Sequence, residues 1–228
     1  MRRSASNSGS VREVASADLD CTRDRLLDVA GEEFAASGYE KATIRDIVAR
    51  AKANIAAVNY HFGGKQQLYR AAMQHGIDVS SKLYPLDEAL VDARTPKHRL
   101  HAFVRMFLRR ILAGGKPAWH GRLMAREMAE PTGALEELAR NTMRPFIDTL
   151  QEIVREIVGD HLSQLQLERC VMSVIAQCVF FNHARPVLEV MYPDHMREPM
   201  DVDGIAEHVA QFSYAGLKAL ASEKTKHA

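Results

Sequence analysis

Apolar residues recur along the chain at intervals of three and four positions, which is the spacing of one face of an α-helix. Gly38 follows the first of these stripes as a candidate C-terminal cap. No segment combines alternating β-branched residues with an Asn-Gly or Asp-Gly turn, the pattern expected of a β-hairpin. The pattern therefore predicts an all-α fold, whose first helix carries the stripe Leu26, Leu27, Ala30 and Phe34.

Two short helices are predicted next, over residues 44–50 and 55–61. Thr43 and Asn54 precede them and offer side-chain oxygens as N-caps. A Gly-Gly pair then breaks the chain before a longer helix over residues 65–81.

The rest of the chain predicts longer helices and contains all eight prolines. Pro145 falls inside one of these helices and should kink or split it, because proline lacks the N–H group and clashes with the preceding turn. The longer helices are predicted near residues 96–113, 117–129, 133–158, 163–185 and 202–221.

The two short helices, with residues 51–53 between them, are the components of a helix-turn-helix, whose second helix enters the major groove of DNA. Ala51 is small enough to let the two helices cross closely. The apolar residues expected to anchor the pair from beneath are Ile44, Ile47, Val48, Val58 and Phe62.

Charge is concentrated in the same segment. Residues 41–70 hold six Lys or Arg and one acid, a local charge of +5 in a chain whose net charge is +1. A basic patch in a balanced chain indicates a region that binds a polyanion. A solvated helical surface is the alternative that charge alone leaves open.

Residues 25–69 resemble the TetR family of bacterial transcriptional regulators. The resemblance implies a homodimer that binds a DNA operator through its N-terminal domain and commonly holds a small molecule in its C-terminal domain. It rests on Leu26-Leu27-Asp28-Val29-Ala30, Phe34-Ala35, Gly38-Tyr39, Ala42-Thr43-Ile44-Arg45-Asp46-Ile47, Tyr60-His61-Phe62-Gly63-Gly64-Lys65 and Leu68-Tyr69.

The chain departs from the family pattern at two positions. Lys52 stands in the turn where Gly is usual, at a cost of about 1 kcal/mol for a conformation that Gly adopts freely. Asn59 stands where an aromatic residue is common. Residues 54–62 are similar to the version of one subgroup, which also contains a run like residues 122–127.

The candidate DNA contacts lie around the two short helices. Hydroxyl, guanidinium, imidazole and ammonium donors suit phosphate oxygens, while Asn amides could pair with adenine and Ala methyls could touch thymine. Each has a structural alternative: Asn54 as a cap only, Tyr60 as a core residue, and the alanines as helix formers. The phosphate candidates are Thr43, Arg45, Tyr60, His61 and Lys65, and the base-reading candidates are Asn54, Ala56, Ala57 and Asn59.

We assign residues 1–20, which are rich in Ser, Ala and Asp, to a disordered tail. The helix-turn-helix DNA-binding domain then covers residues 21–66, and a larger helical effector-binding and dimerisation domain covers residues 67–228. The change in proline content is a second boundary signal and lies further along the chain, at residues 83–96.

The helix near residues 163–185 is apolar on more than one side, so it must be buried on both sides. Together with the last helix, whose stripe includes Val209 and Phe212, it predicts an isologous four-helix interface between two copies. The alternative is the core of a monomeric bundle. The inward arc contains Leu167, Val171, Val174, Ile175, Cys178 and Phe181, and the second arc Met172, Ala176, Val179 and Phe180.

Polar groups on apolar helical faces indicate a site for a flexible, largely apolar effector. Glu127 has a structural alternative, an ion pair with Arg110 or Arg126. The aromatic and Met-rich faces could equally be core. The predicted ligand-binding residues are Phe103, Met106, Phe107, Arg110, His120, Met124, Glu127, Phe146, Cys178 and Asn182.

Other classes of protein find less support in the sequence. The longest nearly apolar stretch, residues 171–181, is shorter than the roughly 20 residues of a membrane span, and residues 1–20 lack the apolar run of a secretory signal. We therefore expect a cytoplasmic protein without a membrane partner. No catalytic motif or phosphate loop appears, so neither an enzyme nor a cofactor is expected.

A thiol or metal sensor, or another all-α binding protein, is the alternative function. Three cysteines make neither a disulfide framework nor a zinc pattern. Cys170 and Cys178 share a helix face without a charged activator, and His98 with His101 lacks a third ligand. No metal site is therefore expected.

Overall fold

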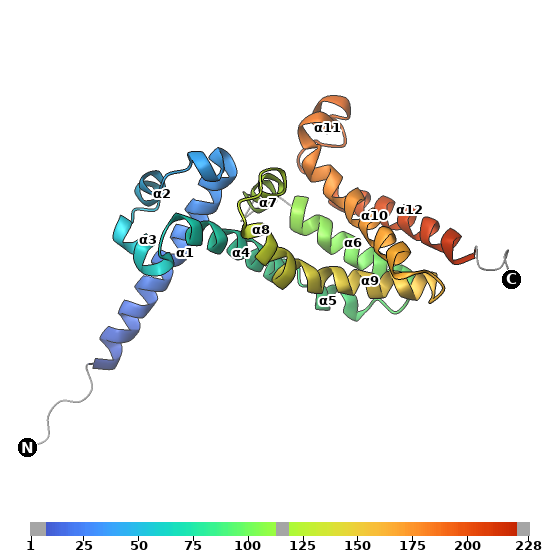
Figure 1. Ribbon diagram of the computed structural model, residues 1–228, viewed down its shortest axis with the longest axis horizontal. Helices are drawn as coiled ribbons and strands as arrows, with labels where there is room; N and C mark the ends of the chain where they lie inside the picture. Colours follow the sequence, from blue (N-terminus) through green and yellow to red (C-terminus); the bar gives the residue numbers. More distant parts are fainter. Residues whose placement is uncertain (1–7, 113–118, 223–228) are drawn as a thin grey trace, which may run out of the picture. The chain divides into compact units, whose positions relative to one another are not determined.

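The computed structural model describes residues 8–112 and 119–222, and its regular elements are helices (Figure 1). No strand occurs within these two ranges. The predicted all-α fold is confirmed. The chain divides into two compact units, Met1–Ile77 and Asp78–Ala228, each of which has its own core.

Unit 1 is a three-helix head with a fourth helix leading out of it. Phe34 is fully buried at its centre and meets the ring of Tyr69 edge-on, with the two centroids 4.9 Å apart. Leu26 and Ile47 are also fully buried. The helices are α1 (Ser8–Lys41), α2 (Ile44–Arg50), α3 (Ile55–Phe62) and the first part of α4 (Lys65–Leu83).

The first helix differs from the prediction at its start. Residues 8–20 are helical, whereas we expected a disordered tail over residues 1–20, of which residues 1–7 lie outside the described ranges. Once the buried stripe has nucleated a helix, each further residue adds a hydrogen bond at small cost, and no proline interrupts the segment. Gly38, with φ 81 and ψ 165, breaks the helical geometry near the other end, as its predicted role in a cap requires.

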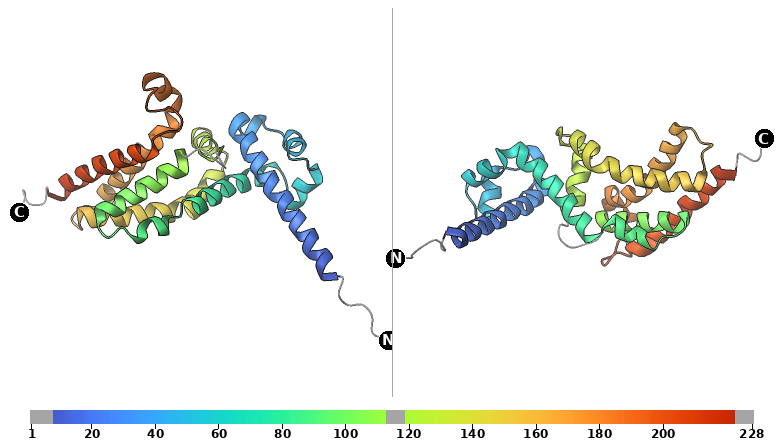
Figure 2. Two further views of the ribbon diagram at one scale, coloured as in Figure 1. Left: turned by 180° about the vertical axis from the view of Figure 1, so that it is seen from behind. Right: turned by 90° about the horizontal axis from the view of Figure 1, so that it is seen from below.

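Unit 2 is a bundle in which α6 packs against α9, α10 and α12 (Figures 1 and 2). Its core includes Phe103 from α6, Ile153 from α9 and Val209 from α12. The helices are α5 (Leu86–Val91), α6 (Pro96–Leu112), α7 (Trp119–Ala129), α8 (Ala134–Leu138), η1 (Ala139–Met143), α9 (Arg144–Val158), α10 (Gln164–His183), α11 (Arg185–Met191) and α12 (Val202–Ser222).

The helix predicted over residues 133–158 is split, as Pro145 led us to expect. It consists of α8, the π-helical turn η1 and α9, and Pro145 occupies the first turn of α9. A proline is tolerated there because the first N–H groups of a helix have no intrahelical acceptor to lose.

Two short helices, α5 and α11, were not predicted. Each has fewer than eight residues and starts next to a proline, so neither contains enough turns to show a helical period. In Figure 1, α11 stands away from the other helices of unit 2. No single described helix is long and apolar enough to cross a membrane, and only α10 and α11 taken together, with a 72° bend between them, pass that test of length and composition.

Within one chain, only the inward of the two arcs predicted on α10 is buried. Leu167 and Val171 on the inward arc are buried, whereas Met172 and Phe180 on the second arc are 58% and 55% exposed. On α12, Val209 of the predicted stripe is buried within the chain, whereas Phe212 of the same stripe is 65% exposed. Phe212 lies about 60° around the helix from Val209, at the edge of the buried face.

Candidate DNA-binding and effector sites

Both helices of the predicted helix-turn-helix begin with the expected side-chain caps. Thr43 Oγ1 accepts a hydrogen bond from Asp46 N at 3.1 Å and donates to Asp46 Oδ2 at 2.6 Å. Asn54 Oδ1 accepts from Ala57 N at 2.7 Å. The caps satisfy N–H groups that would otherwise lack partners, so they fix where α2 and α3 begin.

The turn between α2 and α3 has the expected left-handed backbone conformation at Lys52. Lys52 has φ 49 and is the one non-glycine residue with positive φ among those described. Ala51 is fully buried, and Ala53 N donates to Val48 O at 2.9 Å, which closes the turn. A buried alanine at this position lets the two helices approach each other.

The outer face of α3 is free of packing. Val58 is fully buried beneath the helix, whereas Tyr60 is 75% exposed and Ala56 and Asn59 are also exposed. Ala57 is only half-buried. The structure thus places three of the base-reading or phosphate candidates on one accessible surface and does not bury Tyr60 in the core.

The basic candidates at the helix ends are held in different ways. Lys65 Nζ donates to Glu40 O at 3.2 Å and lies 4.7 Å from the centre of the Tyr39 ring. His61 is half-buried against Tyr60, with ring centroids 5.0 Å apart, and Arg45 is exposed.

Arg50 is a base of the same segment that the charge count treated as free. Its guanidinium pairs with Glu32 at 2.7 Å and Glu33 at 2.8 Å. The positive charge of this head is therefore lower at that end of α2 than the sequence suggests, because the two acids come from α1, outside the counted segment.

In unit 2, four of the predicted ligand-binding residues form one cluster from α6 and α9. The rings of Phe103 and Phe146 stack with centroids 4.5 Å apart, and Phe107 lies 5.0 Å from Phe146. The Arg110 guanidinium lies 5.7 Å from the centre of the Phe146 ring. Arg110 also donates from Nε and Nη2 to Tyr84 O, at 2.9 and 2.8 Å, just beyond the end of α4.

His120, at the start of α7, is buried, and neither ring nitrogen has a hydrogen-bond partner among the described residues. Burial, with a smaller effect from the nearby Arg110 charge, lowers the pKa of His120 to about 4. The imidazole is therefore neutral at physiological pH, with one donor and one acceptor.

Asn182 joins α10 to the start of α7. Its Nδ2 donates to Gly121 O at 3.2 Å, and a Cβ on Gly121 would lie 2.9 Å from Ile111 O. This close approach explains the glycine next to His120, since any larger residue would push α6, α7 and α10 apart.

Glu127 has a structural role that differs from both the predicted effector contact and the alternative ion pair. Its buried carboxylate accepts from Thr132 N at 3.0 Å, from the Thr132 hydroxyl and from Leu135 N at 3.1 Å. These bonds fix the loop that leads into α8. The carboxylate is occupied by the backbone, so we no longer count Glu127 among the effector contacts.

The other predicted ligand residues are dispersed. Cys178 is buried in the α6–α9–α10–α12 core, and burial raises the pKa of its thiol to about 12. Met124 is half-buried on α7. Met106 lines a cavity of 350 Å³ together with Tyr84 and Ala89.

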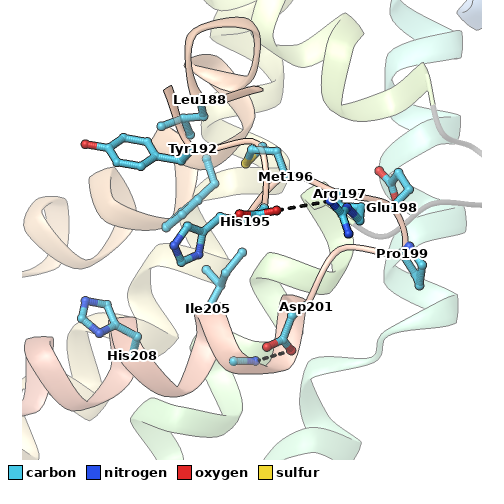
Figure 3. Close-up of a pocket in the computed structure, with 13 residues that line it drawn as sticks. Leu188, Tyr192, His195, Met196, Arg197, Glu198, Pro199, Asp201, Ile205 and His208 are labelled. Atoms are coloured by element: carbon cyan, nitrogen blue, oxygen red, sulfur yellow. Dashed lines mark hydrogen bonds and ion pairs between the residues drawn. The ribbon is translucent and has the colours of Figure 1, made fainter. Parts of the chain in front are cut away.

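A cavity of 750 Å³ lies at the end of α10, beneath α11 and beside the start of α12 (Figure 3). Its lining includes the apolar side chains of Phe181, Leu188 and Ile205 and the imidazoles of His195 and His208. None of the predicted ligand residues lines it. The sequence contained no sign of this cavity, because most of its lining comes from the irregular segment between α11 and α12, which has no helical period.

The geometry defines a class of protein: an N-terminal helix-turn-helix head joined to a helical domain with a buried polar and aromatic cluster. Comparison with known families agrees, since residues 26–72 match the tetR family of bacterial regulatory proteins and residues 96–217 match the C-terminal domain of the HTH-type transcriptional dual regulator CecR. The chain belongs to the TetR family of transcriptional regulators.

Curated relatives and solved structures are similar over most of the chain. The HTH-type transcriptional repressor NicS of Pseudomonas putida is 26% identical over 184 residues, which is 77% of this chain and 82% of the relative. The dual regulator CecR of Shigella flexneri is 27% identical over 70% of this chain and 75% of its own. A structure of Bacillus subtilis FadR with stearoyl-CoA has a TM-score of 0.65 at 13% identity, covering 84% of this chain and 97% of FadR.

A structure of AibR with isovaleryl coenzyme A and operator DNA also has a TM-score of 0.65, at 19% identity, and covers 84% of this chain and 97% of AibR. At these identities the two structures support the fold alone.

Proposed function

We propose that this chain is a homodimeric repressor that binds a pseudo-palindromic operator and is released from it by a small, largely apolar effector. The observation that carries the proposal is the capped helix α3, whose outer face presents Ala56, Asn59 and Tyr60 to solvent above a buried Val58. Such a helix, standing free of its own core, has the form that enters a major groove.

Dimerisation is supported by the distribution of exposed apolar side chains. Phe180 of α10 and Phe212 of α12 are each more than half exposed, although both are large aromatic residues. Exposed apolar patches of this kind mark protein interfaces, and a two-fold interface would bury the same patch on both copies. Two heads are also what an operator with two half-sites requires.

Release by an effector is supported by the unpartnered His120 and by its neighbour Arg110. The similar folds of FadR and AibR hold acyl-CoA molecules, and AibR holds operator DNA as well. We place the effector of this chain beside Arg110, His120 and the rings of Phe107 and Phe146. The repressor NicS supports repression as the sign of regulation.

A thiol-responsive sensor is the second candidate, and the structure gives it little support. Burial raises the pKa of both the Cys170 and the Cys178 thiols. A protonated thiol is a poor nucleophile and a poor metal ligand.

The test of the proposal uses the full-length protein and duplex fragments from the region upstream of its own reading frame. We expect a retarded complex that weakens as salt rises, since phosphate contacts release counterions. Light scattering on the same sample should give twice the chain mass of 25.5 kDa. A protein that binds no duplex at low salt, or that stays at the mass of one chain, contradicts the proposal.

A further inference from the structure

Two polar side chains in unit 2 have unusual surroundings: a buried histidine has no hydrogen-bond partner among the described residues, and a half-buried arginine has no charged one. His120 is 8% exposed, and neither Nδ1 nor Nε2 has a hydrogen-bond partner in the part of the chain that the structure describes. An unpaired buried polar group costs about 1–3 kcal/mol, so native proteins rarely keep one without a ligand or water to satisfy it.

Arg110 is the second of these groups. Its guanidinium is half-buried and donates twice to one neutral acceptor, the Tyr84 carbonyl. Among the described residues it forms no ion pair, in contrast to its neighbour Arg109, which pairs with Asp203 at 2.7 Å. Burial lowers the pKa of Arg110, and the charge of Asp87 has a smaller, opposite effect. The positive charge therefore has no direct counter-ion.

The two groups act on one another and share an apolar surround. The neighbours of the two groups touch, since a Cβ on Gly121 would lie 2.9 Å from Ile111 O, and the charge of Arg110 contributes to the lowered pKa of His120. The Arg110 guanidinium lies 5.7 Å from the centre of the Phe146 ring. Phe107 and Phe146 are only partly buried, although Phe146 also stacks on Phe103, so each ring keeps some surface that is accessible for contact. A lone cation, an N–H donor and aromatic walls together suit an anion attached to an apolar body.

We propose that the effector is a carboxylate with an apolar body: its carboxylate pairs with Arg110 and accepts a hydrogen bond from His120, and its body lies against Phe107 and Phe146. The inference rests on the proposed function, because it names the chemical class of that effector. A carboxylate fits better than a more highly charged group, since one guanidinium supplies one positive charge in a planar fork.

This assignment also gives the effector a means to act. Tyr84 directly follows α4, and its N–H donates to Ser80 O, so Arg110 satisfies a carbonyl at the C-terminal end of that helix. A carboxylate that takes the guanidinium leaves the Tyr84 carbonyl without its donor. The helix α4 begins in unit 1, at Lys65, and ends in unit 2. A hydrogen bond lost at its C-terminal end therefore affects the helix that also forms part of the DNA-binding head.

The experiment compares acids with their neutral amides on the wild-type protein, so that it does not depend on any variant folding. The probes are benzoate, phenylacetate, hexanoate and decanoate, each beside its primary amide, and binding is measured by calorimetry. We expect at least one acid to bind about 10- to 100-fold more tightly than its amide, the range for a charge-assisted hydrogen bond. Equal or tighter binding of the amides, or binding of none of the acids, overturns the inference.

Variants then locate the contact. Arg110→Gln should bring the Kd of the acid to that of the amide, whereas Arg109→Gln, which removes the adjacent surface cation, should leave the ratio of the two values unchanged. Arg110→Lys keeps the charge and should retain part of the preference if the glutamine variant does not fold. An acid preference that survives Arg110→Gln contradicts the assignment.

The two proposals fail in different ways. Loss of acid preference with intact operator binding and an intact dimer refutes the carboxylate class and leaves the regulator standing. Absence of operator binding by the ligand-free protein refutes the proposed function, whatever the calorimetry gives.

Discussion

The Nε atom of Arg25 donates a hydrogen bond of 2.7 Å to the backbone carbonyl of Ala51. Arg25 belongs to α1, and Ala51 is the last residue before the strained position of the helix-turn-helix. The bond fastens the first helix of the head to the turn that sets the angle between α2 and α3. A side chain from outside the motif thus helps to hold Lys52 at positive φ.

Lys52→Gly should stabilise the protein. Glycine adopts φ 49 without the steric cost that a Cβ brings, so we expect a gain of about 1 kcal/mol in the free energy of unfolding, measured with denaturant. Lys52→Ala removes the same charge and keeps the Cβ, so it should leave stability near the wild-type value. A glycine variant less stable than the alanine variant would show that the turn is not strained.

Lys65→Ala and Asn59→Ala should weaken operator binding in different ways. Loss of the Lys65 ammonium should weaken binding to all sequences alike and reduce the salt slope by about 1, as for one lost phosphate contact. Asn59→Ala should cost about 1–3 kcal/mol at particular base pairs if its amide reads a base edge. Gel shifts over a set of operator variants and salt concentrations distinguish the two, and a uniform loss for Asn59→Ala would make it a backbone contact.

His120 should make the protein less stable in acid. Its pKa is lowered to about 4 in the folded state, mainly by burial, from 6.5 in the unfolded chain, so the unfolded state binds the proton first as pH falls. The stabilisation is complete above pH 6.5 and is lost progressively toward pH 4, by about 3 kcal/mol in all.

The measurement for His120 is denaturant unfolding between pH 4 and pH 7. His120→Phe removes the titrating group and should flatten that part of the curve. His98→Gln, which changes an exposed histidine, should leave the slope as it is. A phenylalanine variant with the wild-type slope would assign the acid sensitivity to another group.

Glu127→Ala should destabilise the protein whether or not an effector is present. The substitution leaves the N–H groups of Thr132 and Leu135 without an acceptor in a buried setting, for a loss of about 2–4 kcal/mol in unfolding free energy. Glu130→Ala, a few residues on and exposed, should change stability by less than about 0.5 kcal/mol. A stable Glu127→Ala protein that no longer responds to the effector would restore Glu127 as a ligand contact.

Phe180→Asp should weaken the dimer and, with it, operator binding. A carboxylate in the middle of an apolar interface would be buried without a partner in both copies. Val91→Asp is the control, since Val91 is 75% exposed on α5, and it should leave the mass unchanged. Light scattering over micromolar dilutions measures the effect, and a Phe180→Asp protein that remains a full dimer would place the interface elsewhere.

The head could be predicted closely because its sequence signals are local. Thr43 and Asn54 mark the helix starts, Gly38 marks a break, and each acts within a few residues of itself. The positive φ of Lys52 followed from the family pattern, in which the turn position usually holds glycine.

The C-terminal domain was harder to predict, because some of its polar side chains form hydrogen bonds with residues far away in the sequence. Helical periodicity placed His120 and Glu127 among the polar groups on apolar helical faces. Only the fold shows that Glu127 bonds to the loop after α7 while His120 has no described partner. The hydrogen bond from Arg110 to Tyr84 O joins two helix ends that are 26 positions apart, and helical periodicity cannot predict such a contact.

The cap at Asn54 restricts how this side chain can take part in the DNA contact that we propose for it. Its carbonyl oxygen accepts from Ala57 N, which uses one of the two lone pairs and fixes the amide plane relative to the start of α3. The two N–H donors of the amide remain free of that bond, so under the proposal they are the groups that would meet an acceptor such as guanine O6 or thymine O4. The orientation of a candidate base contact is thus linked to the start of a helix.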